Sequence, residues 1–215
     1  MVEPTPPSPM PMPAPTHVLA PRAGFSGLIA AVGAGRGVIA TDRDGLGLAT
    51  VAMRKGQGLL LSQRIRDVFG IELPNGPRRR SAGRVAFAGT GPDVWLASQE
   101  QGAIGFAAAL ERDLGAAASV SDQSDGYAVL RLAGPMVRNT LAKLVSIDVH
   151  PRAFKVGDVA STMAFHMGVM LWRLEDGSDD SPVFEIAVFR SLAGSFWHAL
   201  AESAAEFGLI SEPPA

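Results

Sequence analysis

Two stretches, TDRDGLGLATVAMRKGQGLLLSQRI (residues 41–65) and SDQSDGYAVLRLAGPMVRNTLAKL (residues 121–144), carry the same succession of features and decide the fold. Each contains an Asp-Gly pair, then alternating apolar residues, then apolar residues at helical spacing. Alternation is typical of a half-buried strand, and recurrence every three to four residues is typical of a helix. The sequence therefore predicts a unit of turn, strand and helix that occurs twice.

The local chemistry sets the bounds of these elements. LGLATVAM (46–53) and YAVLRLAG (127–134) are the predicted strands. The first helix is expected to stop at Gly70, because glycine readily takes the left-handed conformation that ends a helix. Pro135 opens the second helix, since the first helical turn tolerates a proline.

Both units continue in a similar way. GRVAFAGTGPDVWLAS (83–98) and KVGDVASTMAFHMGVMLWRLED (155–176) each predict two strands, and second helices are predicted to begin near Gly102 and Ala193. The later copy is expected to have one more strand, within EDGSDDSPVFEIAVF (175–189). Hairpins interrupted by helices favour an α+β fold over an alternating parallel sheet.

The predicted architecture is an α+β fold, with an internally duplicated mixed or antiparallel sheet and packed helices. Because neither half has much core alone, we expect one compact body over residues 24–209, made of similar halves at about 24–116 and 117–209. Residues 210–215 are expected to form a tail. Residues 1–23 hold half of the chain's 16 prolines, which predicts an extended arm that is either disordered or lies across another subunit.

Composition narrows the possible functions. Among 215 residues there is no cysteine, which excludes disulfides, thiolate nucleophiles and cysteine-ligated metals and suits the cytoplasm. The net charge of -2 does not indicate a nucleic-acid partner. No apolar run reaches the roughly 18 residues of a membrane span, and the amino-terminal region lacks the pattern of a secretory signal.

Motifs for nucleotide binding are incomplete. The glycine-rich segment near residue 30 has Gly33 and Gly35, but the third glycine of a dinucleotide loop is replaced by Val38. Lys55 lacks the glycine spacing of a phosphate-binding loop. A glycine-rich connector is the preferred interpretation of the first segment.

Motifs for metal binding and catalysis are also incomplete. No pair of histidines has metal-ligand spacing among His17, His150, His166 and His198. Ser191 and Ser195 lack the nucleophile-elbow pattern. Asp122 and Asp125 are a possible carboxylate pair, but the Ser and Gly beside them favour a turn.

Two groups of residues suit contacts with other proteins. Arg78, Arg79 and Arg80 follow a turn sequence and predict a solvated loop or a protein-contact patch. The three tryptophans are large enough to anchor an interface, although tryptophan is more often a core residue. Spacing leaves both interpretations open for Trp95, Trp172 and Trp197.

Several long strings resemble one known family. They are ASVSDQSDGYAVLRLAGPMVRNTLAKLVSIDVHPRAFKVGDVA (118–160), LWRL (171–174), VFEIAVFRSLAGSFWHALAESAAEFGL (183–209), GLGLATVAMRKGQ (45–57) and IRDVFGIELPNGPRR (65–79). Together they resemble the gamma subunit of heterotetrameric sarcosine oxidase over about residues 37–209. The resemblance implies the folate-binding fold of the glycine-cleavage T-protein, which is itself internally duplicated.

The resemblance also implies a function. The family belongs to complexes of alpha, beta, gamma and delta subunits that oxidise the N-methyl group of sarcosine, with tetrahydrofolate accepting the one-carbon unit. FAD, FMN and NAD are implied in or between alpha and beta, folate in alpha and zinc in delta. A similar subunit occurs in N-methylglutamate dehydrogenase. This chain is therefore expected to be a structural subunit without catalytic, cofactor-binding or metal-binding residues.

Two other functions remain open at this stage. One is a stand-alone folate-binding protein of the T-protein type that transfers a one-carbon unit. Such a protein needs a carboxylate in its central cleft, for which Asp42, Asp44 and Asp122 are the candidates. The other is a general interaction module, which is expected to be a stable monomer.

Overall fold

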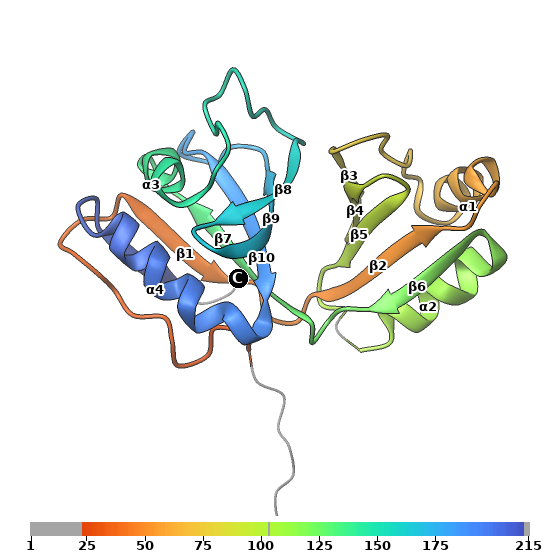
Figure 1. Ribbon diagram of the computed structural model, residues 1–215, viewed down its shortest axis with the longest axis horizontal. Coiled ribbons are helices and arrows are strands. Elements are labelled where there is room, and N and C mark those ends of the chain that lie inside the picture. Colours follow the sequence, from red (N-terminus) through yellow and green to blue (C-terminus); the bar gives the residue numbers. More distant parts are fainter. Residues whose placement is uncertain (1–22, 103, 213–215) are drawn as a thin grey trace, which may run out of the picture.

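The computed structural model describes residues 23–102 and 104–212, which form eleven strands in two sheets and four α-helices (Figure 1). The six-stranded sheet has the order β11-β1-β7-β10-β9-β8 and the five-stranded sheet the order β3-β4-β5-β2-β6. All strand pairs are antiparallel except β1 with β11, which is parallel. The predicted α+β fold with a mixed or antiparallel sheet is confirmed.

The elements have the following bounds. The six-stranded sheet consists of β1 (Val38–Asp42), β7 (Tyr127–Ala133), β8 (Val159–Ala164), β9 (Met167–Arg173), β10 (Val183–Phe189) and β11 (Leu209–Glu212). The five-stranded sheet consists of β2 (Gly47–Met53), β3 (Arg79–Ala82), β4 (Val85–Gly91), β5 (Val94–Gln99) and β6 (Ala118–Asp122). The helices are α1 (Gly58–Phe69), α2 (Phe106–Leu114), α3 (Val137–Leu144) and α4 (Ala193–Ala204).

Helix α1 shows how the sequence pattern becomes structure. Leu61 and Ile65, one helical turn apart, are its buried residues, while Leu59 is 91% exposed. The helix ends at Gly70, whose φ of 67° is left-handed and whose N–H donates to the Arg66 carbonyl. The predicted helix and its glycine stop are both present, because they depend only on neighbouring residues.

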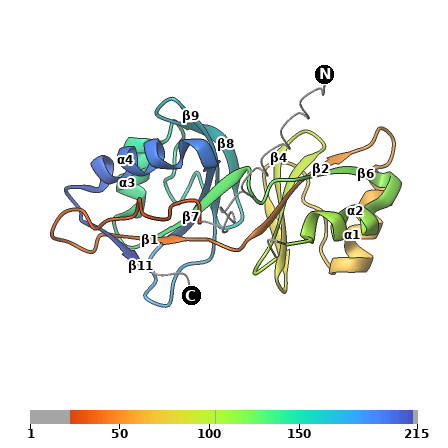
Figure 2. The same cartoon turned by 90° about the horizontal axis from the view of Figure 1, so that it is seen from below.

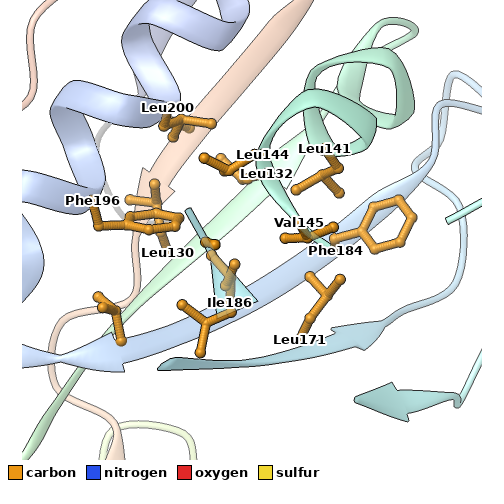
Figure 3. Close-up of a cluster of buried hydrophobic side chains, with 14 of the residues drawn as sticks. Leu130, Leu132, Leu141, Leu144, Val145, Leu171, Phe184, Ile186, Phe196 and Leu200 are labelled. Carbon is orange, nitrogen blue, oxygen red and sulfur yellow. The ribbon is translucent and has the colours of Figure 1, made fainter. Parts of the chain in front are cut away.

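The sheets face each other and the helices cover their outer faces (Figures 1 and 2). Helices α3 and α4 pack on the six-stranded sheet around a core that includes Leu130, Ile186 and Phe196 (Figure 3). Helices α1 and α2 pack on the five-stranded sheet around Phe87 and other apolar residues. A third, smaller apolar cluster joins the two sheets and includes Trp172.

The duplication is visible in the order of the strands. The run β2, α1, β3, β4, β5, α2 corresponds to the run β7, α3, β8, β9, β10, α4. Within the sheets these runs give the same arrangement, β3-β4-β5-β2 and β8-β9-β10-β7. A further strand then pairs antiparallel with the first strand of each run, β6 with β2 and β1 with β7. The two halves therefore share one topology.

The halves exchange their first strands. Strand β1 precedes the first run but lies in the sheet of the second, and β6 precedes the second run but lies in the sheet of the first. Each Asp-Gly pair lies in a segment that connects one sheet to the other. Neither pair forms the turn of a hairpin. The crossings are held by Arg43 N–H donating to the Val129 carbonyl at 2.9 Å and Gln123 N–H donating to the Leu48 carbonyl at 2.8 Å.

The sheets consequently divide the chain differently from the expected halves at 24–116 and 117–209. Residues 118–122 join the first half's sheet, and residues 38–42 join the second half's sheet. Residues 210–212, expected in a tail, belong to β11, which is held in the sheet by its parallel pairing with β1. The proline-rich arm lies outside the described residues except for Ala23.

The expectation that the second copy has one strand more than the first is wrong. Strand β10 is present as predicted, but the first copy also has a third strand, β3. Its sequence, RRSA, has no apolar alternation because β3 is an edge strand with two exposed residues. Pattern analysis depends on a buried face, so it misses such a strand.

Candidate functional site: an arginine-lined cleft between the sheets

A cleft of about 670 Å³ opens between β3 of one sheet and β7, β9 and β10 of the other. Its walls include five arginines and two carboxylates. These residues are Arg78, Arg79, Arg80, Arg131, Arg173, Glu175 and Asp176. The cleft is therefore a cationic site built from both halves of the chain.

Backbone hydrogen bonds fix the β3 wall of the cleft. Arg79 N–H donates to the Gly157 carbonyl at 2.7 Å, and Val159 N–H donates to the Pro77 carbonyl at 2.9 Å. These bonds tie the start of β3 to the start of β8 of the other sheet. The arginine cluster is thus part of an ordered strand and its approach, with Arg80 exposed and the two preceding arginines half-buried.

Arg173, at the end of β9, also lines the cleft and is 3% exposed. Its Nη1 donates to the Val183 carbonyl at 2.9 Å, and its Nη2 pairs with Asp176. The guanidinium carbon lies 5.1 Å from the centre of the Phe184 ring, a cation–π distance. Its Nε is buried and has no partner among the described residues.

A buried ion cluster lies behind the cleft and is centred on Glu185 of β10. One Glu185 oxygen accepts from Arg43 Nε at 2.9 Å and from Arg131 Nη2 at 2.7 Å. The other accepts from Trp172 Nε1 at 2.8 Å. Arg43 also pairs with Glu100, which follows β5 of the other sheet. Arg43 therefore joins carboxylates from both halves.

Arg79 lies within the electrostatic field of this cluster. Burial lowers the pKa of its guanidinium, because desolvation penalises the charged form. Glu185 and Glu100 oppose that shift, while Arg131 and Arg43 reinforce it. No sequence pattern indicates this environment, since its members come from positions that are distant along the chain. The Glu within the otherwise apolar strand VFEIAVF was the available signal.

Two of the three aspartates that were candidates for a central carboxylate lie together. Asp42 is 8% exposed and accepts a hydrogen bond from Phe25 N–H at 3.1 Å, and Asp44 lines the same small cavity of about 20 Å³. Burial raises the pKa of Asp42, and the nearby Asp44 adds to the rise. Asp122 is exposed and accepts from Ser124 N–H at 2.9 Å, which confirms its predicted role in a turn.

The tryptophans are core residues. Their exposed fractions are 8% for Trp95, 3% for Trp172 and 7% for Trp197, and each belongs to a different apolar cluster. Trp95 also donates from its indole nitrogen to the Pro74 carbonyl at 2.9 Å. The interpretation of these side chains as surface anchors is therefore wrong.

The histidines and serines considered for catalysis are dispersed. His150, His166 and His198 are exposed, and His166 lies in the turn between β8 and β9. Ser191 and Ser195 are also exposed. Within residues 23–102 and 104–212 no three His, Asp or Glu side chains are grouped as metal ligands require. His17 lies outside the described residues.

The α-helices of the described residues are 8 to 12 residues long. In the described part of the chain, none combines the length and the apolar character that crossing a bilayer requires.

A protein-family model described as the sarcosine oxidase gamma subunit family matches residues 57–206. The chain belongs to this family. That match covers most of both halves of the duplicated body, from the start of α1 to the end of α4. The resemblance inferred from the sequence strings is confirmed.

Two curated relatives are gamma subunits of sarcosine oxidase. The one from Arthrobacter sp. is 34% identical over 133 residues, which are 61% of this chain and 59% of the relative. The one from Corynebacterium sp. (strain P-1) is 39% identical over 89 residues, which are 41% of this chain and 43% of the relative. The chain thus spans less than two thirds of the length of the curated relatives it matches.

Solved structures share the fold. A chain of the heterotetrameric sarcosine oxidase from Corynebacterium sp. U-96, in complex with pyrrole 2-carboxylate, matches with a TM-score of 0.72 and 24% identity, over 87% of this chain and 96% of that one. The glycine cleavage system aminomethyltransferase T from Bartonella henselae matches with a TM-score of 0.58 and 13% identity, over 83% of this chain and 48% of that one. The predicted T-protein-like fold is confirmed.

Proposed function

We propose that this chain is the gamma-type, non-catalytic subunit of a heterotetrameric flavin-dependent oxidoreductase that demethylates sarcosine or a related N-methyl amino acid such as N-methylglutamate. Membership of the gamma subunit family, over residues 57–206, is the observation that carries the proposal. The fold adds support, because it matches nearly the full length of one chain of a heterotetrameric sarcosine oxidase. The partners in the proposal are alpha, beta and delta subunits.

The proposal places FAD, FMN, NAD, tetrahydrofolate and zinc in the other subunits. The part of the interface between the sheets that lies outside the arginine-lined cleft is filled, which supports that placement. An apolar cluster that includes Leu48 and Trp172 lies there, and the ion cluster around Glu185 lies beside it. The cavity at Asp42 and Asp44, of about 20 Å³, has room for about one water molecule and not for a pterin ring.

A co-expression experiment tests the supporting role. The four subunits are produced together, with and without this chain, and purified through a tag on the alpha subunit. We expect the preparation without this chain to contain less assembled complex by native mass, less bound flavin and a lower rate of sarcosine or N-methylglutamate oxidation. Full assembly, flavin content and turnover in its absence would show that the role is wrong.

A stand-alone folate-binding protein of the T-protein type is the second candidate. The likeness to aminomethyltransferase T and the buried carboxylate of Asp42 favour it. Titrating the isolated chain with tetrahydrofolate separates the two functions, with Asp42→Asn as the variant and Asp113→Asn, an exposed position on α2, as the control. Micromolar binding that is lost only in Asp42→Asn would support the folate-binding function over the structural one.

A further inference from the structure

The arginines of the cleft differ in whether a carboxylate already neutralises them. Arg78 pairs with Asp158, Arg131 with Glu185 and Arg173 with Asp176. Arg79 and Arg80, in contrast, form no ion pair with any carboxylate of residues 23–102 and 104–212. Two successive residues of β3, whose side chains project to opposite faces of the strand, therefore lack a paired carboxylate.

Arg79 and Arg80 differ in how far they are buried. Arg79 is half-buried and lies close enough to Glu185 and Glu100 for their charges to act on it, yet among the described residues its side chain donates only to the Ser81 hydroxyl, at 3.3 Å. Arg80 is exposed and also lines a smaller adjoining groove of about 240 Å³. One free guanidinium therefore lies within the cleft and the other at its rim.

Arg173 also lines the cleft, but contacts within the chain already engage it. Contacts with Asp176, the Val183 carbonyl and the Phe184 ring hold its guanidinium in place. Its Nε is nevertheless buried without a partner in the described part of the chain, and a buried donor of a charged group is costly to leave unpaired. Because that atom is buried and the guanidinium lies against Phe184 of the core under α3 and α4, Arg173 offers no free donor to a ligand in the cleft.

The size and rigidity of the cleft limit what it can accept. Its volume of about 670 Å³ is typical of ligand pockets and far exceeds what one phosphate or one carboxylate fills. Its walls are fixed by the backbone bonds from Arg79 to Gly157 and from Val159 to Pro77. A guanidinium group can donate two parallel N–H hydrogen bonds. An arginine held in place therefore suits a carboxylate or phosphate group, because it can bind two oxygens of that group at once.

We propose that this cleft binds a ligand that carries two or more carboxylate or phosphate groups, with Arg79 inside the cleft and Arg80 at its rim. This chemistry has two sources: a dissolved polyanion and an acidic segment of a neighbouring chain. The inference goes beyond the proposed structural role. It does not depend on that role, because ligand binding is measured on the isolated full-length chain.

Calorimetric titration at low salt tests the site, because salt screens exposed charges. The probes are citrate, tripolyphosphate and an acetylated, amidated hexaglutamate peptide, with hexaglutamine as the uncharged control. The variants are Arg79→Gln and Arg80→Gln. The matched control is Arg112→Gln, which removes the same charge from the exposed last turn of α2.

We expect at least one anionic probe to bind the unaltered chain and hexaglutamine not to bind. Arg79→Gln and Arg80→Gln should each weaken that binding by about tenfold or more, as the loss of a charge-assisted hydrogen bond does, while Arg112→Gln should change it by less than about twofold. Arg80 is exposed, so its variant is informative even if Arg79→Gln folds poorly.

The probes also identify the source of the ligand. Tighter binding of hexaglutamate than of citrate and tripolyphosphate indicates an acidic segment of another chain, and the reverse indicates a dissolved polyanion. Both results support the site. Absence of binding by all three probes overturns it, and so does an equal loss of affinity in Arg112→Gln and Arg80→Gln.

Discussion

The indole Nε1 of Trp172 donates a hydrogen bond of 2.8 Å to Glu185 Oε2, and the two residues are directly paired across β9 and β10. Glu185 is 4% exposed and points away from the helices, toward the five-stranded sheet. Its second oxygen accepts from Arg43 and Arg131. A single carboxylate therefore joins the duplicated halves at their interface through three donors.

Replacing Glu185 with Gln should destabilise the chain strongly. The change keeps the size of the side chain but leaves Arg43, whose side chain is 10% exposed, with less compensation for its buried charge. Breaking a buried pair by removing one partner costs about 3–5 kcal/mol, and the remaining Glu100 contact places the expected loss near the lower end. Urea unfolding followed by circular dichroism measures the free energy of unfolding.

Glu202→Gln is the matched control for that variant, because its partner is His198 and both side chains are more than two-thirds exposed. An exposed pair contributes about 0–1 kcal/mol, so the control should unfold close to the unaltered chain. Equal unfolding free energies for the two variants would contradict the assignment of Glu185 as the central ion of the interface.

Gly208, just before β11, should not tolerate a side chain. Its φ is +79°, and a Cβ added there would lie 2.1 Å from the Gly35 carbonyl oxygen, a backbone atom that cannot turn away. Gly56 has a similar φ of +76° but nothing within 4 Å of an added Cβ. Gly56→Ala therefore measures the conformational cost alone, about 1–2 kcal/mol.

Gly208→Ala should lose clearly more stability than Gly56→Ala in thermal or urea unfolding. The excess reports the clash with Gly35 and hence the close packing that holds β11 against its sheet. If the two alanine variants have the same midpoint, the backbone contact between Gly35 and Gly208 is looser than described.

The predictability of this fold depends on how local the determining interactions are. Helix α1, its stop at Gly70 and the strands β2 and β7 were predicted, because each depends on periodicity and capping within one segment. The exchange of β1 and β6 between the sheets was not predicted. A strand's apolar pattern specifies that one face is buried but does not specify which neighbour it pairs with.

The candidate site was less predictable for a related reason. Arg78–Arg80 stood out as the one basic cluster, but the two interpretations offered, a solvated loop or a protein-contact patch, missed their position on the wall of a cleft. The sequence pattern does not indicate a site at Arg131 or Arg173, because each is an isolated charged residue within a predicted strand. Backbone hydrogen bonds between residues 77–79 and residues 157–159 bring these arginines together, and no spacing rule encodes those bonds.

The core between the six-stranded sheet and its helices should respond to a deletion of volume. Leu130 is fully buried on β7 and lies among Leu132, Ile186 and Phe196 (Figure 3). Leu130→Ala should cost about 2–5 kcal/mol, because it removes apolar contacts and leaves a cavity. Leu59→Ala on α1, where the side chain is 91% exposed, is the control and should change the unfolding free energy by less than about 0.5 kcal/mol.

The buried carboxyl of Asp42 should make stability depend on pH. Burial is the main reason that its pKa in the folded chain lies above the ordinary value of 3.8. Between these two pKa values the folded state binds more protons than the unfolded state, so the free energy of unfolding falls as pH rises. The carboxyl therefore opposes folding above its folded pKa and is best tolerated when it is protonated.

Asp42→Asn removes this titration while keeping an oxygen that can accept from Phe25 N–H. Relative to the unaltered chain, the variant should gain stability as pH is raised from about 3 to 7, as measured by urea unfolding at several pH values. Asp113→Asn, at an exposed position on α2, serves as the control and should give a flatter difference. A stability difference between Asp42→Asn and the unaltered chain that stays constant over this range would mean that Asp42 is as well solvated when folded as when unfolded, contrary to its 8% exposure.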